Sequence, residues 1–275
     1  MSNVALITGT SSGMGLHAAV DLAKRGMHVV ATMRDTARSG ALRDAAATAG
    51  VEVDVRALDV VDHEAAARLV AQLEAELGGI HVLVNNAGQG SVASAEQLTM
   101  GQIQDQLDIN YLAPVNLAKL VLPAMRQRGS GRIITVTSVG GAVGQPFADA
   151  YCGAKFAVEG FMQSLAVVAE RFGVRVSVFE PGAVASSFVA NVSRAEEDGP
   201  YGALLEAYRS RTAGAFASAQ SSESAGAAIA AAVMSDEYRF RWQSSERATA
   251  FVEVSLADSG GSRVLEFTRP WIAAG

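Results

Sequence analysis

The stretch "NVALITGTSSGMG", residues 3–15, decides the fold. Its apolar half predicts a strand buried on both faces, and Gly9, Gly13 and Gly15 predict a sharp turn into a helix that starts near Gly13. Such a turn lets the backbone approach a pyrophosphate, whose charge then lies at the helix N-terminus. The spacing differs from G-x-G-x-x-G, so a turn that needs glycine only for its positive φ angle remains an alternative.

The same alternation of an apolar strand and an Ala-rich helix continues along the chain. Strands are expected at 3–8, 28–33, 51–60, 80–85, 131–138 and 174–180. Helices are expected at about 14–25, 39–49, 62–77, 96–128 and 149–172. This alternation is typical of βαβ units. The sequence therefore predicts an α/β fold, a doubly wound parallel sheet (Rossmann fold), as a single domain over residues 1–275.

The regular alternation of strands and helices ends after Pro181. Residues 183–220 form a long mixed segment with several aromatic side chains, and connections of that length are usually lids or binding loops. We therefore expect this segment to cover the substrate. A C-terminal extension follows at about 237–275, and no glycine-rich final strand is evident in it.

Composition restricts the classes of function. The net charge of −6 and a pI near 5.3 argue against nucleic acid as a partner. Cys152 is the only cysteine, and His17, His28, His63 and His81 lack ligand spacing, so we expect neither a disulfide nor a metal site. No signal-peptide pattern is present, and no apolar stretch approaches the ~20 residues that span a bilayer. We expect a cytoplasmic protein without a membrane partner.

Further polar groups fall at the carboxyl ends of later strands, where open α/β sheets bind ligands. "NNAG", Asn85–Gly88, ends the fourth expected strand, and Ser138 ends the fifth. The next helix begins with "YCGAK", which places the Tyr151 phenol and the Lys155 ammonium one helical turn apart on one face. The spacing brings these groups toward the same edge of the sheet.

With these elements in this order, the sequence resembles the short-chain dehydrogenase/reductase family. The hallmarks of that family are a TGxxxGxG turn, an NNAG element, an active-site Ser, a YxxxK pair and a PG after the sixth strand. This chain has "TGTSSGMG", "NNAG", Ser138, "YCGAK" and "PG" at 181–182, over roughly residues 3–182. The resemblance implies a nicotinamide-dependent oxidoreductase that is a homodimer or homotetramer.

The Tyr151 and Lys155 pair suits proton transfer to a ketone or from an alcohol. A free phenol has a pKa of about 10, and Lys155 together with an oxidised nicotinamide ring would bring that pKa closer to neutrality. Tyr151 is the expected general acid/base, and Ser138 can hydrogen-bond the substrate oxygen. By resemblance, Asn110 in "LDIN" holds a water in a proton relay to Lys155, which also holds the nicotinamide ribose.

Two other interpretations of these residues stay open. Tyr151 could cap a core above a lysine that snorkels to the surface, and Asn110 could simply satisfy backbone groups in a buried turn. A regulatory protein that senses the dinucleotide without turnover is an alternative of another class. Such a sensor needs no proton donor beside the nicotinamide, so the intact set of Ser138, Tyr151 and Lys155 favours an enzyme.

The type of cofactor depends on the end of the second strand. NAD-binding proteins place an acidic residue there for the ribose hydroxyls, but this chain has Met33. Arg34 can pair with a 2′-phosphate, which favours NADP(H), whereas Asp35 leaves NAD(H) open. Asp59 could bind the cofactor or could be a strand-end helix cap. By resemblance, the cofactor is bound by Gly9, Ser11, Ser12, Gly13, Met14, Gly15, Arg34, Asp59, Val60, Asn86, Ala87, Gly88, Tyr151, Lys155, Pro181, Gly182 and Val184.

The expected substrate is an apolar ketone or secondary alcohol. "ATMRD", "EPG" and the chain length are similar to the branch of the family that acts on steroids, retinoids and other bulky alcohols and ketones. A polyketide or fatty-acyl ketoreductase is the alternative. Leu204, Leu205 and Tyr208 could line the pocket or form the core face of a short helix. The expected substrate contacts are Ser138, Gln145, Tyr151 and Phe188.

Overall fold

Strand β1, Val4–Thr8, forms the centre of a parallel sheet in the computed structural model, which describes residues 3–186, 193–194, 199–260 and 262. All five of its residues are buried, because helices cover both faces of the sheet. The glycine turn follows, and helix α1, Gly13–Lys24, begins within it. The local structure expected from the opening stretch is therefore confirmed.

The main sheet has seven strands, all parallel, in the order β11-β7-β6-β4-β1-β2-β3. The chain reverses its direction of travel across the sheet between β1 and β4, which is the switch point of a doubly wound fold. The remaining main-sheet strands are β2 His28–Met33, β3 Asp54–Ala57, β4 Val82–Asn85, β6 Gly131–Val136, β7 Val174–Glu180 and β11 Arg241–Gln243. The predicted Rossmann fold is confirmed.

The seventh strand, β11, is an addition to the six strands expected from the sequence, and it is not a glycine-rich final strand. β11 pairs with β7 through the register Arg241 to Val178, Trp242 to Phe179 and Gln243 to Glu180. It is only three residues long and contains a buried arginine, so it lacks the apolar run that marks the other strands.

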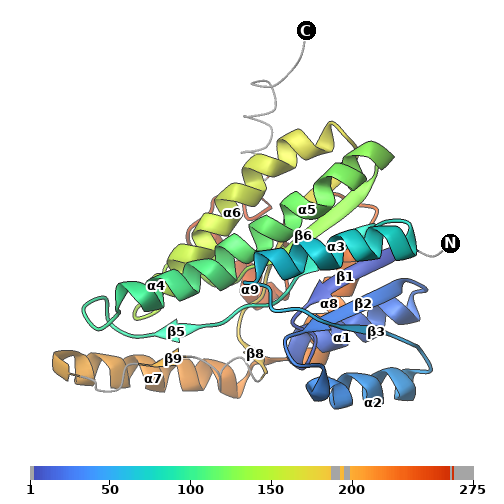
Figure 1. Cartoon of the computed structure of the whole chain (residues 1–275). Helices are drawn as coiled ribbons and strands as arrows, with labels where there is room; N and C mark the ends of the chain where they lie inside the picture. Colours follow the sequence, from blue (N-terminus) through green and yellow to red (C-terminus); the bar gives the residue numbers. More distant parts are fainter. Residues whose placement is uncertain (1–2, 187–192, 195–198, 261, 263–275) are drawn as a thin grey trace, which may run out of the picture.

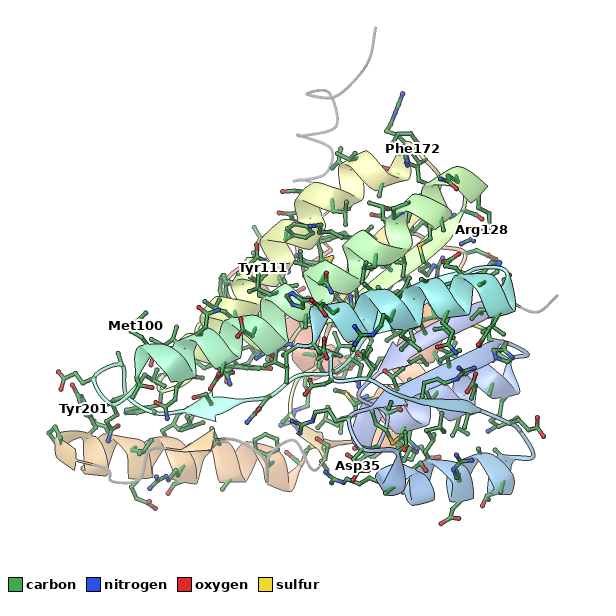
Figure 2. All side chains as sticks on the ribbon, in the orientation of Figure 1. Asp35, Met100, Tyr111, Arg128, Phe172 and Tyr201 are labelled. Carbon is green, nitrogen blue, oxygen red and sulfur yellow. The ribbon has the colours of Figure 1, made fainter. Side chains whose placement is uncertain are left out.

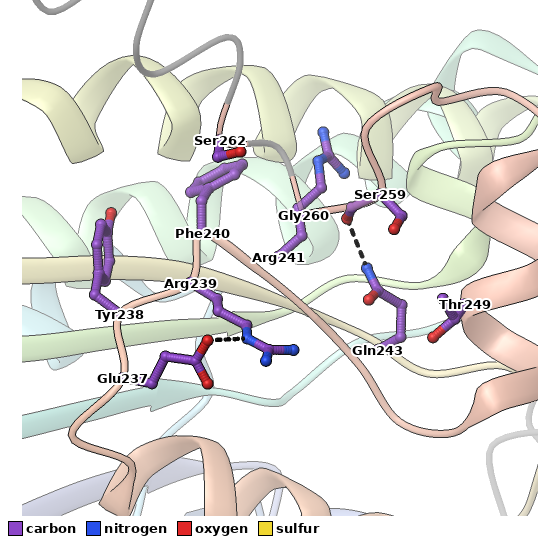
Figure 3. A pocket seen from close by; sticks show the side chains of 10 residues that line it. All are labelled: Glu237, Tyr238, Arg239, Phe240, Arg241, Gln243, Thr249, Ser259, Gly260 and Ser262. Carbon is purple, nitrogen blue, oxygen red and sulfur yellow. Dashed lines mark hydrogen bonds and ion pairs between the residues drawn. The ribbon is translucent and has the colours of Figure 1, made fainter.

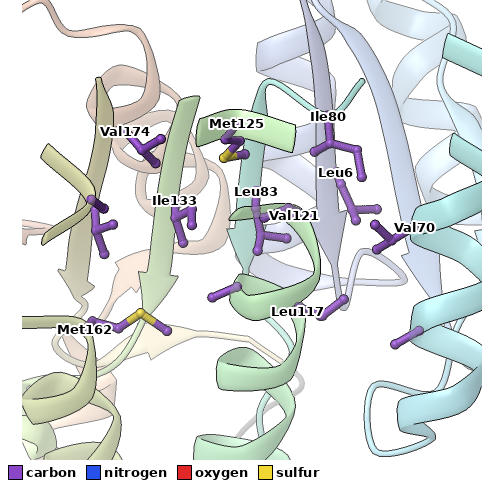
Figure 4. Packing of buried hydrophobic residues seen from close by; sticks show 14 of the residues in the cluster. Leu6, Val70, Ile80, Leu83, Leu117, Val121, Met125, Ile133, Met162 and Val174 are labelled. Atoms are coloured by element: carbon purple, nitrogen blue, oxygen red, sulfur yellow. The ribbon is translucent and has the colours of Figure 1, made fainter. Parts of the chain in front are cut away.

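Helices cover the sheet on both faces (Figure 1). On one face lie α3 His63–Leu77, α5 Ala113–Arg128 and α6 Asp149–Glu170, whose apolar side chains pack on Leu83 and Ile133 of the central strands (Figure 4). On the other lie α1, α2 Gly40–Ala49 and α8 Ser222–Met234. Shorter helices α4 Met100–Leu107 and α9 Glu246–Glu253 lie beyond the sheet edges.

The described parts of segment 183–220 contain a helix and short strands, and its expected role in covering the substrate stays a prediction. Its second half is helix α7, Gly202–Ala217. The two ends of the segment pair with each other, as β8 Val184–Ala185 and β10 Gln220–Ser221. Within the segment, β9 Ser193–Arg194 pairs with β5 Ser91–Val92. Leu205 is buried, whereas Leu204 is 63% exposed and is not part of the core. The Ala-rich sequence favours helix here once the two ends are held.

The search for membrane-spanning helices covered the described residues. None of their helices is both long enough and apolar enough to span a bilayer.

Candidate active site

The glycine turn is fixed by close backbone contact with the segment after β4. Gly9 and Gly13 have φ angles of 70° and 64°, which only glycine adopts without strain. A Cβ on Gly9 would lie 2.8 Å from Ala87 Cα, and one on Gly15 would lie 2.3 Å from Asn86 Nδ2. Glycine is therefore required both for the positive φ angle and for the packing of the turn.

The NNAG segment holds this turn in place. Asn86 Nδ2 donates to the carbonyls of Thr8 at 2.8 Å and Gly9 at 3.0 Å. Thr8 Oγ1 in turn accepts the backbone N–H groups of Asn86 and Ala87, both at 3.0 Å. The side chain of Asn86 thus holds the turn in shape. The buried Thr8 holds the NNAG backbone, a role that the sequence analysis missed because no separate signal marks it.

The start of α1 has the features that suit a bound phosphate. Ser12 has extended backbone angles at the N-cap, and its side chain makes no capping hydrogen bond to the helix. Ser11 lies in the turn itself, while the partly buried Met14 packs against the core cluster beneath α1. The first N–H groups of a twelve-residue helix therefore lie at the carboxyl edge of the sheet, where a pyrophosphate fits.

Arg34 and Asp35 follow β2 and differ in what they contact. Asp35 Oδ1 accepts the Ala37 N–H at 2.9 Å and caps the short helix Thr36–Ser39 that leads into α2 (Figure 2). Arg34 is exposed at the end of the strand, and Met33 is buried in the core below it. One oxygen of the exposed Asp35 carboxylate is therefore bonded locally, while the guanidinium of Arg34 is exposed beside it at this strand end.

Asp59 and Val60 follow β3 at the same edge. Asp59 Oδ1 accepts the Val61 N–H at 3.3 Å, so the side chain closes a local turn. The cap of α3 is Asp62, which accepts from Ala65 at 2.8 Å. The alternative of Asp59 as the cap of this helix is therefore wrong. Val60 is buried beneath the turn.

Ser138 and Tyr151 are brought into hydrogen-bonding contact. Ser138 follows β6 and caps the 3-10 helix Val139–Gly141, accepting the Gly140 N–H at 2.9 Å. Its hydroxyl also bonds the phenol of Tyr151, which lies in the first turn of α6. Two hydroxyls from separate elements therefore meet at one point of the sheet edge.

Lys155 lies one turn along α6 with its ammonium below the Tyr151 ring. Its Nζ is 5.8 Å from the ring centroid and donates to the Val136 carbonyl at 3.1 Å. The residue is only 4% exposed, so the interpretation as a lysine that snorkels to the surface is wrong. This carbonyl fixes the ammonium at the end of the strand that carries Ser138.

Asn110 lies in a π-helical turn, Asp108–Leu112, between α4 and α5. Its Nδ2 donates to the Gln89 carbonyl at 2.9 Å and to Gln106 Oε1 at 3.1 Å. A Cβ on Gly88 would lie 2.9 Å from Asn110 Oδ1 and 3.5 Å from Lys155 Nζ, so both polar atoms face the same small space. Asn110 thus bonds a backbone carbonyl, as in the interpretation of a buried turn, and it also lies near Lys155, while its part in a proton relay stays a prediction. π-helical turns are frequent at functional sites.

Burial is the largest influence on the pKa values of Tyr151 and Lys155. Desolvation raises the pKa of Tyr151 to about 12, against a smaller lowering by the hydrogen bond from Ser138. Desolvation also lowers the pKa of Lys155 to about 8. In the chain without cofactor, burial thus sets the direction of the Tyr151 pKa shift, and the shift toward neutrality expected with the oxidised nicotinamide bound stays a prediction. At neutral pH the phenol keeps its proton.

An aromatic pair lies above this centre. Phe147 adopts a φ angle of 61°, a conformation that a bulky side chain rarely takes, and its ring lies 5.7 Å from that of Tyr208 on α7. Gln145 lies beside Ser138, since a Cβ on Gly140 would be 3.1 Å from Gln145 Nε2 and 3.3 Å from Ser138 Oγ. Phe188 lies outside the described residues. Phe147 was missed, because nothing in the sequence signals its φ angle.

Pro181, Gly182 and Val184 follow β7 and border the site. The Pro181 carbonyl accepts the Val139 N–H at 3.0 Å, which joins this segment to the turn after Ser138. Val184 is buried in β8. The predicted catalytic and cofactor-binding residues within the described part of the chain thus lie along the carboxyl ends of neighbouring strands.

A cavity of about 460 Å³ lies elsewhere, along β11 (Figure 3). It is lined by Glu237–Arg241, Gln243, Thr249, Ser259, Gly260 and Ser262. No residue predicted for catalysis or binding lines it. Among the described residues, no group of three or more His, Cys, Asp or Glu side chains could hold a metal ion.

Comparison with known proteins agrees with this geometry. A family model described as short chain dehydrogenase matches residues 3–197. The chain belongs to the short-chain dehydrogenase family. This short-chain dehydrogenase is therefore an oxidoreductase of alcohols and ketones that binds a nicotinamide dinucleotide.

Relatives of this short-chain dehydrogenase include two curated enzymes that align with nearly all of it. Retinol dehydrogenase 8 of Homo sapiens is 37% identical over 96% of this chain and 88% of its own. Estradiol 17-beta-dehydrogenase 1 of Rattus norvegicus is 36% identical over 96% of this chain and 80% of its own. These names place it nearest the steroid and retinoid branch.

Solved structures of short-chain dehydrogenases share the fold. One from Streptomyces avermitilis has a TM-score of 0.84 at 29% identity and covers 98% of this chain and 96% of its own. A metagenomic short-chain oxidoreductase in complex with NADP has a TM-score of 0.63 at 32% identity, over 66% of this chain and 84% of its own.

Proposed function

We propose that this protein is an NADP(H)-dependent carbonyl reductase or alcohol dehydrogenase for bulky apolar ketones and secondary alcohols, with Tyr151 as general acid/base. The observation that carries the proposal is the arrangement of Ser138, Tyr151 and Lys155. A serine hydroxyl bonds the phenol, and a buried ammonium lies under the phenol ring. A sensor of the dinucleotide needs no such proton donor, so the arrangement favours catalysis.

The chemistry assigned to the chain is proton transfer and charge stabilisation. The nicotinamide supplies the hydride when it is bound. Tyr151, protonated at neutral pH because its pKa is about 12, gives its proton to the ketone oxygen as that oxygen gains charge. Ser138 donates to the same oxygen and holds it against the phenol. Lys155, charged below a pKa of about 8, stabilises the phenolate that is left, and Asn110 lies beside it for a proton relay.

The residues at the sheet edge fit a dinucleotide. The glycine turn admits a pyrophosphate at the start of α1, and Lys155 is placed to hold the nicotinamide ribose. Asp59, Val60, the Asn86–Gly88 backbone and the segment from Pro181 to Val184 form the rest of the cradle. Arg34 supports NADP(H), because it is exposed at the end of β2 while Asp35 is bonded to Ala37.

A screen of ketones tests the function. Purified protein is incubated with NADPH or NADH and with aliphatic, aromatic, polycyclic and acyl-thioester ketones, and oxidation of the cofactor is followed by absorbance. We expect the fastest oxidation with NADPH and an apolar polycyclic ketone. Faster turnover of acyl-thioester ketones would favour the polyketide or fatty-acyl reductase. Cofactor binding without turnover of any ketone would favour the sensor.

Arg34→Ala tests the cofactor assignment. Removing the guanidinium should weaken NADPH binding by roughly 1.5 to 3 kcal/mol, the size of a charge-assisted contact, and leave NADH binding almost unchanged. Fluorescence titration of both cofactors measures this. Arg25→Ala, which removes an exposed arginine paired with Asp21 at the far end of α1, is the matched control. Equal weakening of both cofactors by Arg34→Ala would contradict the assignment.

Tyr208→Ala tests the substrate side. Its ring contacts Phe147 in the loop just before Tyr151, so we propose that the pair forms a wall against an apolar ketone. Removing the ring should change the ratio of kcat/KM between polycyclic and small aliphatic ketones by a factor on the order of ten, with cofactor affinity unchanged. Tyr201→Ala at the outer end of α7 is the control (Figure 2). Identical ketone preferences in both variants would make Tyr208 an ordinary packing residue.

A further inference from the structure

A buried cluster of charged side chains lies behind the candidate active site. Arg241, the first residue of β11, donates through Nη1 to Glu159 Oε2 on α6 and to Glu180 Oε1 at the end of β7. Gln243 donates to Glu180 Oε2 at 2.5 Å. The side chains of Glu159 and Glu180 are 3% and 0% exposed, and that of Arg241 is 9% exposed. The proton-transfer chemistry above uses none of these groups directly.

The charges in this cluster are not balanced within it. Two carboxylates share one guanidinium, and burial raises the pKa of both Glu159 and Glu180, that of Glu180 to about 7. Repulsion from Glu159 contributes to the shift at Glu180, while Arg241 opposes it at both. The cluster carries two negative charges against one positive charge when both acids are ionised. When both acids are ionised, a further cation close by would therefore stabilise the cluster.

Lys155 is a buried amine on the same helix as Glu159. It precedes Glu159 by four residues on α6, so the two side chains lie on one face of the helix. The carboxylate of Glu159 raises the pKa of Lys155, while desolvation lowers it. The groups around Lys155 are the Tyr151 ring, Asn110 and the Val136 carbonyl, and none of them carries a full negative charge at neutral pH.

The Glu159 carboxylate also lies against the backbone of the short helix that Ser138 caps. A Cβ on Gly141 would lie 2.2 Å from Glu159 Oε1, so the acid contacts the short helix that Ser138 caps. Thr137, the residue before Ser138, reaches the same carboxyl group. Glu180 immediately precedes Pro181, whose carbonyl holds the turn after Ser138. The cluster therefore contacts the elements that carry Ser138, Tyr151 and Lys155.

We propose that Arg241 keeps Glu159 ionised and that Glu159 in turn keeps Lys155 protonated beneath Tyr151. Arg241 and Glu159 are thus positioning residues, which act on proton transfer through Lys155 and contact neither substrate nor cofactor. This deepens the proposed function and rests on it for the catalytic role of Lys155. The charge coupling itself is a property of the folded chain and is measurable without turnover.

The direct test is the titration of Lys155 by NMR. The lysines of this chain are Lys24, Lys119 and Lys155, so protein labelled with 13C at lysine Cε gives few signals, and Lys155→Met assigns one of them. In the wild type the Lys155 signal should titrate near pH 8. In Glu159→Gln the midpoint should fall by about one pH unit or more, because the partner charge is lost while the shape of the side chain is kept. The exposed Lys24 and Lys119 are internal references whose signals should not differ between variants.

Glu180→Gln separates charge coupling from a general loosening of the structure. It removes the acid that competes for Arg241, so Glu159 should stay ionised and the Lys155 midpoint should not fall. Arg241→Met should lower the midpoint, and Arg241→Lys, which keeps the charge, should restore it. Glu237→Gln, which breaks an exposed ion pair with Arg239, is the matched control. Because Arg241→Met leaves two buried acids without a cation and risks misfolding, the two glutamine variants decide the question.

The outcomes distinguish this inference from the proposed function. An unchanged Lys155 midpoint in Glu159→Gln, or an equal fall in Glu159→Gln and Glu180→Gln, would overturn the inference whether or not the protein is active. Affinity for NADPH, measured against pH by fluorescence, should fall at the Lys155 midpoint in each variant. A shifted Lys155 midpoint in a protein that binds no nicotinamide cofactor would support the coupling and contradict the function.

Discussion

Replacing Tyr151 by phenylalanine is expected to lower ketone turnover by a factor on the order of a hundred or more. The substitution removes one hydroxyl and keeps the ring, so the contact above Lys155 and the packing of α6 should survive. What is lost is the proton that the phenol, with a pKa of about 12, would give to the forming alkoxide. The measurement is kcat with NADPH and the best ketone from the screen, together with the dissociation constant of NADPH.

The control for this variant is Tyr238→Phe. The Tyr238 hydroxyl also makes a hydrogen bond, to the Val176 carbonyl at 3.0 Å, but the residue lines the cavity along β11 instead of the candidate active site. It should lose about 1 kcal/mol of folding stability and keep its turnover. Near-normal turnover of Tyr151→Phe would rule out Tyr151 as the proton donor.

Lys155→Met should have the second large effect, because two roles are proposed for this ammonium. Methionine can fill the buried space without its charge. We expect turnover to fall roughly a hundredfold, as the phenolate loses its stabilising cation, and cofactor affinity to fall about tenfold, as a charge-assisted contact is lost.

The pH dependence makes the Lys155 prediction specific. In the wild type, Lys155 is charged below its pKa of about 8, so cofactor affinity should be highest below that pH and fall as pH rises through it. In Lys155→Met the affinity should be low throughout and lack this step. Lys119→Met, at an exposed position on α5, should retain both the affinity and the step. A step that persists in Lys155→Met would show that another group causes it.

The sheet and the turn could be predicted because their signals are local. Continuous apolar runs such as Val4–Thr8 mark strands that are covered on both faces, and the glycines mark a turn that no other residue can make. The order of the motifs along the chain then placed Ser138, Tyr151 and Lys155 at one edge of the sheet, since the carboxyl ends of parallel strands meet there.

Other features depend on contacts between distant segments and carry no local signal. β11 is three residues long and is held by its pairing with β7 and by the buried ion pairs of Arg241. The helical form of α7 and the φ angle of Phe147 follow from how their segments pack. The rise of the Tyr151 pKa in the chain without cofactor depends on the degree of burial, which spacing along a helix does not reveal.

The position of Arg241 has a consequence for the biosynthesis of the protein. Arg241 comes 61 positions after Glu180, so a growing chain exposes both acids long before it contains the guanidinium that pairs with them. The core of the first six strands can collapse early, but burying Glu159 and Glu180 without Arg241 costs free energy. The catalytic helix therefore reaches its final charge state only when the last strand has docked. Pairing of β11 with β7 is thus expected to be a late folding step that supplies the ion-pair partner of Glu159 on α6.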